Sequence, residues 1–348
     1  MNAFVLYGPD NIRFEEVEIP SPKKGEVLVK VKAVGICGSD IPRIYQTGAH
    51  KHPLIPGHEF SGIVTEVGEG VRKEWLNQNV GVFPLIPCGK CKCCQNKQYE
   101  MCDNYDYLGS RSDGGFAEYV VVPEWNLIGL PENISYEAAA MLEPMAVCVH
   151  AIRKGMPQKD DVVVVCGLGT IGQLLTMFLM EMGIEKILVV GNKEFQKEIA
   201  IQQGIPEEDY CNSKIEDAEH WIMEKTGGNG ANVFFECVGK NETLVYGLRC
   251  AAPMAKIVTV GNPYSDVFLD KNDYWRILRK QLQIVGTWNS SFIHDENDDW
   301  HYVLNKLADG TIRPDKLISH RYSLNEFEAG LHIMRDKSEE FIKIMAID

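Results

Sequence analysis

The chain has 348 residues, of which 45% are hydrophobic and 24% are charged, as is typical of a globular protein with about two domains. Its formal net charge of −14 at pH 7 argues against general binding to nucleic acid or to an anionic membrane surface. An anionic substrate would therefore need a local basic pocket. The first residues lack the basic start and apolar core of a signal peptide, and the eleven cysteines are an odd number, so we expect a cytoplasmic protein with reduced thiols.

The first 145 or so residues are expected to be rich in β-strands. Apolar residues alternate or run together over residues 27–34, 60–67 and 117–122. Turns that contain glycine and proline separate these stretches. The pattern predicts a β-rich first domain.

Four cysteines in this region, Cys88, Cys91, Cys94 and Cys102, follow the spacing C-x2-C-x2-C-x7-C. Thiolates this close in sequence can converge on one tetrahedral zinc ion and leave it no open position. A ferredoxin-type iron–sulfur cluster shares the two short gaps, but its last gap has three residues and a proline follows it. Here the last gap has seven residues, so the spacing favours structural zinc. The sequence leaves open whether Cys93, which adjoins Cys94, could substitute as a ligand.

After residue 145 or so, short apolar runs alternate with helical stretches. The expected strands cover residues 162–166, 187–190, 233–237, 256–260 and 282–285, and helices are expected between them, for example at 171–182 and 194–203. Strands that alternate with helices predict a parallel sheet covered on both faces.

The C-terminal region predicts helices near 298–307 and 324–334 and a short strand at 341–347. We therefore expect an α/β chain in two parts. A doubly wound dinucleotide-binding domain spans residues 147–288, and residues 289–348 pack back onto the first domain, residues 1–146.

The strand at 162–166 leads into Gly167-Leu168-Gly169-Thr170-Ile171-Gly172, a G-x-G-x-x-G motif. Residues 162–180 carry no charge, but their glycines and polar residues favour a strand, turn and helix over a membrane span. In this context Gly167 allows the tight turn, Gly169 lets a pyrophosphate approach, and Gly172 allows close helix packing. The start of the helix would then present free N–H groups to the phosphates.

The next strand ends at Gly191-Asn192-Lys193, where NAD-binding proteins usually carry an acid that binds the adenosine ribose. No acid stands at this strand end, and Lys193 could pair with a 2′-phosphate. The sequence therefore favours NADP(H), although Glu194 weakens that preference and Lys193 could instead be a solvated residue at the helix start.

A second set of metal-ligand types lies in the first domain. Cys37 stands in Cys-Gly-Ser-Asp, His58 in Gly-His-Glu, and Glu143 precedes a proline. Each residue alone is unremarkable, but all three precede the dinucleotide motif in the chain.

Together with the cysteine cluster and the glycine loop, these segments resemble the zinc-dependent medium-chain dehydrogenase/reductase family over essentially the whole chain. The resemblance implies a GroES-like catalytic domain, a Rossmann domain, and a catalytic zinc held by Cys37, His58 and Glu143. An acid at position 143 resembles the pattern of the polyol dehydrogenase branch. The resemblance also implies that Glu59 either lies next to the zinc ligands or alternates with them as a ligand. By the same analogy, Glu236 and Gly239 form part of the nicotinamide wall.

Catalytic zinc would act as a Lewis acid with an open position for the substrate hydroxyl, and one thiolate, one histidine and one carboxylate suit a chelating polyol. Ser39, two residues after Cys37, either begins a proton relay or hydrogen-bonds the backbone of a turn. Segments around Arg43, His50 and Arg111 resemble polyol-phosphate members of the family. The candidates for a phosphate clamp are Arg43, His50, Lys51 and Arg111.

The sequence is compatible with three functions. The leading one is oxidation of a polyol phosphate, and the alternative is an unphosphorylated polyol or diol dehydrogenase of the sorbitol or butanediol type. A non-catalytic zinc-binding member of the superfamily is a remote third, because Cys37, His58 and Glu143 are all present. The family also implies a homodimer or homotetramer formed through the edge of the Rossmann sheet.

Overall fold

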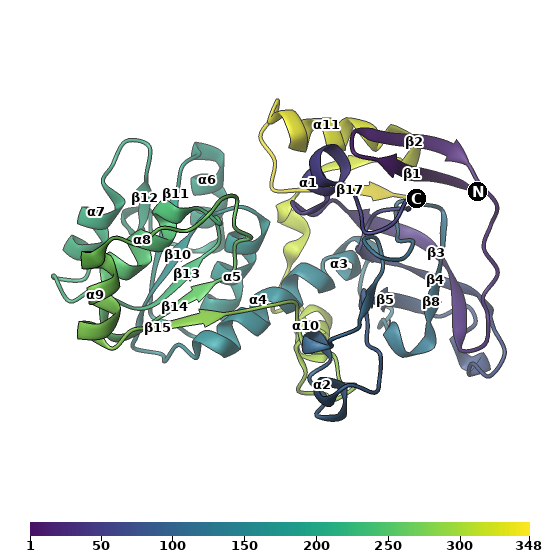
Figure 1. Ribbon diagram of the computed structural model, residues 1–348, viewed down its shortest axis with the longest axis horizontal. Coiled ribbons are helices and arrows are strands. Elements are labelled where there is room, and N and C mark those ends of the chain that lie inside the picture. Colours follow the sequence, from purple (N-terminus) through teal and green to yellow (C-terminus); the bar gives the residue numbers. More distant parts are fainter. The chain divides into compact units, whose positions relative to one another are not determined.

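The chain folds into two units, described by a computed structural model that covers all residues, Met1–Asp348. The first unit comprises Met1–Pro144 and Ser290–Asp348, and the second comprises Met145–Asn289 (Figure 1). No helix combines the length and apolar character that crossing a membrane would require. By this division, the C-terminal segment belongs to the same unit as the N-terminus and the strand that follows it, β1 (Asn2–Gly8).

The first unit is built on a seven-stranded sheet in the order β16-β17-β3-β4-β5-β9, with β8 pairing off this path onto β3. These strands are β3 (Glu26–Gly35), β4 (Glu59–Val67), β5 (Asn79–Val82), β8 (Tyr119–Pro123), β9 (Leu127–Gly129), β16 (Ile318–Tyr322) and β17 (Lys343–Ile347). The remaining strands and helices of this unit are β2 (Asn11–Glu16), α1 (Asp40–Pro42), β6 (Leu85–Ile86), α2 (Lys92–Gln95), β7 (Asp106–Tyr107), α3 (Tyr136–Ala140), α10 (Asp299–Ala308) and α11 (Glu328–Asp336).

The strand β3 organises this sheet because three strands pair with it. Its valines are β-branched and buried, as suits a strand covered on both faces. At its end, Gly35 lies opposite Glu59 of β4 on one side and Met345 of β17 on the other. Residues from three distant parts of the sequence therefore meet at the point where β3 ends.

Aromatic side chains join the C-terminal segment to the core of the first unit. The ring of Phe327, just before α11, lies 5.1 Å from that of Phe116 and 6.3 Å from that of Phe4. On α10, Trp300 is 1% exposed and its ring is 5.5 Å from that of Phe83. Burial of aromatic rings, at about 25 cal/mol per Å² of apolar surface, explains why this segment packs here.

The second unit is a parallel sheet in the order β12-β11-β10-β13-β14-β15, with helices α5 to α9 beside it (Figure 1). Its strands are β10 (Val162–Cys166), β11 (Lys186–Gly191), β12 (Tyr210–Asn212), β13 (Ala231–Glu236), β14 (Ala251–Thr259) and β15 (Gln283–Gly286). Its helices are α5 (Thr170–Glu181), α6 (Glu194–Gln203), α7 (Ala218–Lys225), α8 (Asn241–Cys250) and α9 (Lys271–Lys280), while α4 (Leu142–Gly155) crosses the boundary between units. The first strand, β10, lies between β11 and β13, so the strand order reverses there, and a ligand crevice is expected at its carboxyl end.

The expected fold class, a β-rich domain with a Rossmann domain, is confirmed by this architecture and by the relatives described below. The strand at 162–166 and the helix at 194–203 have the predicted bounds. The strands that were not predicted individually span two to seven residues each, which carry little periodicity. They are β1, β2, β5, β6, β7, β9, β12 and β16. In the expected helix at 324–334, a 3₁₀ turn precedes α11.

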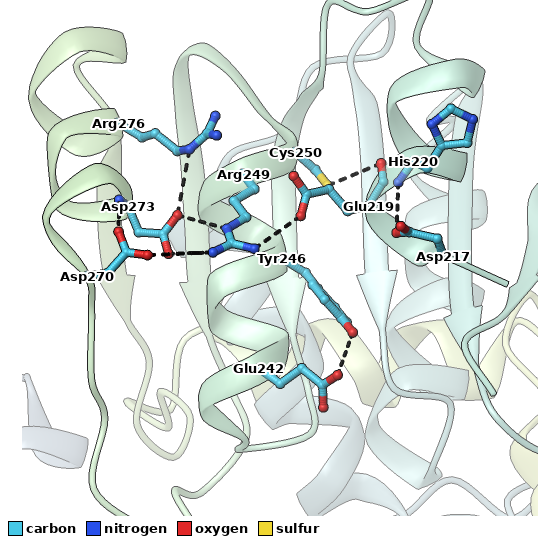
Figure 2. A network of polar contacts seen from close by, with 10 residues as sticks. All are labelled: Asp217, Glu219, His220, Glu242, Tyr246, Arg249, Cys250, Asp270, Asp273 and Arg276. Carbon is cyan, nitrogen blue, oxygen red and sulfur yellow. Dashed lines mark hydrogen bonds and ion pairs between the residues drawn. The ribbon is translucent and has the colours of Figure 1, made fainter.

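An ion-pair network ties three helices of the second unit together (Figure 2). Arg249 of α8 donates from Nε and Nη2 to the two carboxylate oxygens of Asp273 in α9, at 2.8 and 3.0 Å, and its Nη1 reaches Glu219 of α7 at 3.5 Å. Asp270 caps α9 by accepting from the N–H groups of Asn272 and Asp273. Asp273 is 3% exposed, so its charge depends on the guanidinium fork.

The Arg249→Met substitution is expected to destabilise the second unit by about 1–3 kcal/mol, because it leaves the buried Asp273 carboxylate with only Arg276 as a partner. Arg249→Lys should cost less, since it keeps the charge but loses the fork. Urea unfolding followed by circular dichroism measures both. Equal stability of Arg249→Met and wild type would contradict the role assigned to the fork.

Candidate functional site

Four sulfur atoms converge in the loop that carries α2. The Sγ atoms of Cys88, Cys91, Cys94 and Cys102 all lie within 4.8 Å of one another, and Cys93 is not part of this group. Three Sγ–Sγ distances are 3.5, 3.9 and 4.0 Å. A tetrahedron with Zn–S bonds of ~2.3 Å has edges of ~3.8 Å, so the geometry fits one zinc ion with no open position.

Local backbone geometry prepares these sulfurs to hold a cation. Cys91 caps α2, where its Sγ accepts from the N–H of Cys94, and the N–H of Cys88 donates to Sγ of Cys102. Backbone N–H groups of Cys94 and then Asp103 lower the pKa of the Cys91 thiol to about 6. Burial raises the pKa of the Cys94 thiol to about 12, so four thiolates at neutral pH need a metal ion.

A second group forms where β3 ends and β4 begins. One ligand atom each from Cys37, His58 and Glu59 lies within 4.8 Å of the others. The antiparallel pairing of Gly35 with Glu59 brings the two loops together. The hydroxyl of Ser39 donates to Sγ of Cys37 at 3.3 Å, so its hydrogen already points at a ligand atom. One thiolate, one imidazole and one carboxylate are a donor set that suits zinc with an open position.

Behind His58 lies Asp40, which is fully buried. Its Oδ2 accepts from the N–H of Cys37 at 3.0 Å, and its Oδ1 lies 3.4 Å from Nδ1 of His58, an ion-pair distance without the angles of a full hydrogen bond. Arg43 donates to the same Oδ1. Burial opposes ionisation, but His58 and Arg43 together hold the pKa of Asp40 below its usual value. Asp40 therefore orients the imidazole, a role the sequence analysis did not assign.

Glu59 is paired with a buried lysine from the far end of the chain. Lys343 of β17 is 1% exposed, and its ammonium group contacts Oε2 of Glu59 and donates to the carbonyl of Ile36 at 3.0 Å. A Cβ on Gly35 would lie 2.6 Å from that same Glu59 oxygen and from Cε of Lys343, so only glycine leaves room. In the sequence, the only sign of this pair was a lysine, Lys343, at the start of the otherwise apolar strand β17.

Glu143 lies at the start of α4 and outside the three-atom group. It is 7% exposed, and its Oε1 accepts from the hydroxyl of Tyr107 at 3.2 Å. The ring of Tyr107 is 5.8 Å from that of His58. Burial raises the pKa of Glu143 to about 7, with His58 opposing the rise and Glu59 adding to it. The geometry thus places Glu59 with Cys37 and His58, and a ligand role for Glu143 stays a prediction.

The second unit has a cavity of ≈390 Å³ at the carboxyl end of its sheet. The turn after β10 lines it with Gly167, Leu168 and Gly169. Gly167 has φ +98°, and a Cβ on Gly172 would strike the carbonyl oxygen of Gly167. Space around Gly169 is open, and α5 begins at Thr170 without a side-chain cap. This cradle fits a pyrophosphate group on the helix N-terminus.

The other predicted cofactor residues divide into two sets. Gly191 and Asn192 line the cavity, whereas Lys193 is not in its lining and its ammonium group lies 5.5 Å from the ring of Phe195. Oε1 of Glu236 accepts from the N–H groups of Val238 and Gly239 and from the hydroxyl of Thr243. Glu236 therefore holds the turn after β13, and Val238 and Lys240 line the cavity in its place.

The four phosphate candidates lie in different surroundings. Arg43 is committed to Asp40, and His50 and Lys51 are exposed on one loop. The guanidinium group of Arg111 lies 4.4 Å above the ring of Tyr105, whose ring is 6.3 Å from that of Tyr107. Tyr107 in turn contacts His58, so Arg111 is joined to the metal-ligand group by a row of rings.

Two family profiles match the sequence. The alcohol dehydrogenase GroES-like domain matches residues 23–132, and the zinc-binding dehydrogenase domain matches residues 170–309. Galactitol 1-phosphate 5-dehydrogenase of Escherichia coli K12 is 32% identical over 317 residues, 91% of each chain. L-threonine 3-dehydrogenase of Pyrococcus horikoshii is 34% identical over 92% of this chain and 91% of its own length. Sorbitol dehydrogenase of Halalkalibacterium halodurans is 31% identical over 97% and 96%.

Solved structures agree with this grouping. Galactitol-1-phosphate dehydrogenase from Escherichia coli superposes with a TM-score of 0.93 at 31% identity, over the whole of both chains. A zinc-binding dehydrogenase from Sinorhizobium meliloti bound to NADP has a TM-score of 0.91 at 28% identity, over 100% of this chain and 99% of its own. An Escherichia coli alcohol dehydrogenase complexed with NADH has a TM-score of 0.90 at 28% identity and the same coverage.

Replacing Cys94 by serine is expected to remove one zinc ion per chain, because a hydroxyl replaces one of four converging thiolates. The matched control is Cys93→Ser, next in sequence but outside the sulfur group, which should keep the metal content of wild type. Metal analysis of the purified proteins measures both. Zinc loss from Cys93→Ser with retention in Cys94→Ser would reverse the assignment.

Replacing Lys343 by methionine should destabilise the first unit by about 3–5 kcal/mol, because Glu59 is left buried without its cation. A Lys343→Met/Glu59→Gln double variant should recover much of that loss, since no lone charge remains. Urea unfolding of the two single variants and the double variant measures the coupling. Additive losses would show that the pair does not act as a unit.

Proposed function

Because the chain belongs to the zinc-dependent medium-chain dehydrogenase/reductase family, we propose that it oxidises a polyol phosphate, with galactitol 1-phosphate as the leading substrate, to a keto-sugar phosphate. The broader activity is that of a zinc-dependent alcohol or polyol dehydrogenase that uses a nicotinamide cofactor. The phosphorylated substrate and the preference for NADP(H) are the proposed parts.

Two zinc ions per chain follow from the two ligand groups. Cys88, Cys91, Cys94 and Cys102 would saturate a structural ion, which would hold a loop of about fifteen residues with little core of its own. The catalytic ion would be held by Cys37 and His58 with a carboxylate from Glu59 or Glu143. When bound, this zinc supplies a Lewis acid that lowers the pKa of a substrate hydroxyl, and the nicotinamide ring accepts hydride.

The chain's own residues orient the reaction. Asp40 and Arg43 hold the ring of His58 so that one nitrogen stays free for the metal. The Ser39 hydroxyl lies 3.3 Å from Sγ of Cys37, and in a relay its oxygen would accept the proton of the substrate hydroxyl while releasing its own hydrogen. Tyr107 donates to Glu143 and fixes the second buried carboxylate beside His58.

The row of contacts from Arg111 through Tyr105 and Tyr107 to His58 is the observation that carries the phosphate proposal. A guanidinium group held on a ring is oriented in advance for a bidentate phosphate contact. Arg43 loses support for this role, because it donates to the buried Asp40 and therefore acts on His58.

An unphosphorylated polyol or diol remains the second candidate. Two buried carboxylates, Glu59 and Glu143, accompany one thiolate and one histidine, and oxygen-rich sites suit a substrate with vicinal hydroxyls whether or not it carries a phosphate. The sorbitol dehydrogenase relative at 31% identity supports this reading as well.

We also propose a homodimer or homotetramer that forms through β15. This strand is the edge of the parallel sheet, and Ile284 within it is 46% exposed. The adjoining helix α9 exposes Tyr274, Trp275 and Leu278 at 55%, 46% and 58%. An open strand edge beside apolar side chains is a surface that a second copy would cover.

Arg111→Met should raise KM for galactitol 1-phosphate by about 10–100-fold, the value of one charge-assisted phosphate contact, and leave KM for galactitol and sorbitol near wild type. The matched control is Arg13→Met, because Arg13 lies over the ring of Tyr7 at 4.8 Å in the same kind of contact. Steady-state kinetics with phosphorylated and free polyols measures this. Equal KM changes for both substrate types would rule out the clamp.

A further inference from the structure

We propose that the shared end of β11 and β12 is a 2′-phosphate subsite in which Lys214 supplies the cation, and that Tyr210 excludes the acid on which NAD-binding chains rely. This inference rests on the proposed use of NADP(H) and names the residues that would enforce it. The sequence singled out neither Tyr210 nor Lys214, because Tyr210 lies in the short strand β12 and Lys214 follows it.

The position of the adenosine ribose follows from the fold. In doubly wound folds, the ribose hydroxyls face the end of the strand after the glycine turn, which here is the end of β11 at Gly191. Gly191 and Asn192 line the ≈390 Å³ cavity that also receives the glycine turn. Ser213 and Lys214 line the same cavity from the next strand.

The position of Ser213 and Lys214 is fixed by the sheet. Gly191 pairs with Asn212, and the carbonyl of Gly191 accepts from both the N–H and the hydroxyl of Ser213, at 2.9 and 3.0 Å. The N–H of Lys214 donates to Oδ1 of Asn212 at 3.1 Å. These bonds hold the Lys214 backbone beside the end of β11.

The charges around this end of the cavity favour an anion there. The ammonium group of Lys214 makes no ion pair within the chain, whereas Lys197 on α6 is paired with Glu194 and Glu207. Two acids lie nearby. Glu216 accepts from the N–H of Asn212, and Glu242, which lines the cavity from α8, accepts from the hydroxyl of Tyr246. A free cation beside the ribose position matches a phosphate better than a hydroxyl.

The surroundings of residue 191 leave little room for an acidic side chain. A Cβ on Gly191 would lie 3.0 Å from Cε2 and from the hydroxyl of Tyr210, and 3.2 Å from Cδ1 of Leu168. Tyr210 is 6% exposed, and its hydroxyl donates to the carbonyl of Lys193 at 3.3 Å, so the ring is held in place. The tyrosine thus occupies the space that an aspartate side chain at 191 would need.

The test compares two ligands that differ only in the 2′-phosphate, adenosine 2′,5′-bisphosphate and 5′-AMP. Calorimetry on the zinc-loaded protein should show that wild type binds the bisphosphate at least about tenfold more tightly. Lys214→Met should lower that ratio by about tenfold. Lys240→Met, a lysine that lines the cavity from the turn after β13, should leave the ratio unchanged.

The outcomes separate the subsite from the cofactor preference. Wild-type protein that binds 5′-AMP as tightly as the bisphosphate would overturn both the subsite and the preference for NADP(H). A preference for the bisphosphate that survives in Lys214→Met would overturn the subsite alone. Neither result bears on the polyol phosphate, because no substrate is present.

The exclusion by Tyr210 has its own test. Gly191→Asp alone should not tighten 5′-AMP binding, whereas Gly191→Asp/Tyr210→Ala should tighten it by about tenfold over Tyr210→Ala, because the carboxylate can then reach the ribose hydroxyls. Thermal unfolding checks that all three proteins are folded. Tighter 5′-AMP binding by Gly191→Asp alone would refute the exclusion.

Discussion

The buried ion pair between Lys343 and Glu59 is the contact on which the first unit depends most. The two residues lie 1% and 2% exposed, 284 positions apart in the sequence, and they meet over Gly35 at the end of β3. Taking a charge out of water costs several kcal/mol per ion, so neither group is stable there without the other. The last strand of the chain is thereby bound to the same point as the metal ligands.

The two groups of metal-ligating residues suit different roles, one structural and one catalytic. In the cysteine loop, four thiolates would fill the coordination shell of a zinc ion and leave no position for a substrate. Around Cys37 and His58, the donors are mixed and supported from behind by Asp40, Arg43 and Lys343. Support of this kind orients a ligand without occupying the metal, which a catalytic site requires and a structural site does not.

The second unit relies on close backbone approach rather than on buried charge. Gly167 and Gly172 let the turn after β10 lie tightly against α5, while the buried Glu236 carboxylate holds the turn after β13 through backbone N–H groups. These two turns line the cofactor cavity. The residues that contact a cofactor are therefore placed by glycines and by one carboxylate that itself faces the protein.

Local spacing was enough to predict the cysteine cluster, the glycine turn and most strands, because each depends on residues within about fifteen positions of one another. The tertiary structure decided what no local pattern contains. It put Glu59 rather than Glu143 with Cys37 and His58, gave Arg43 to Asp40, and brought Lys343 to the site. Pairing between distant strands sets those contacts, and a buried charge finds its partner only once the sheet has formed.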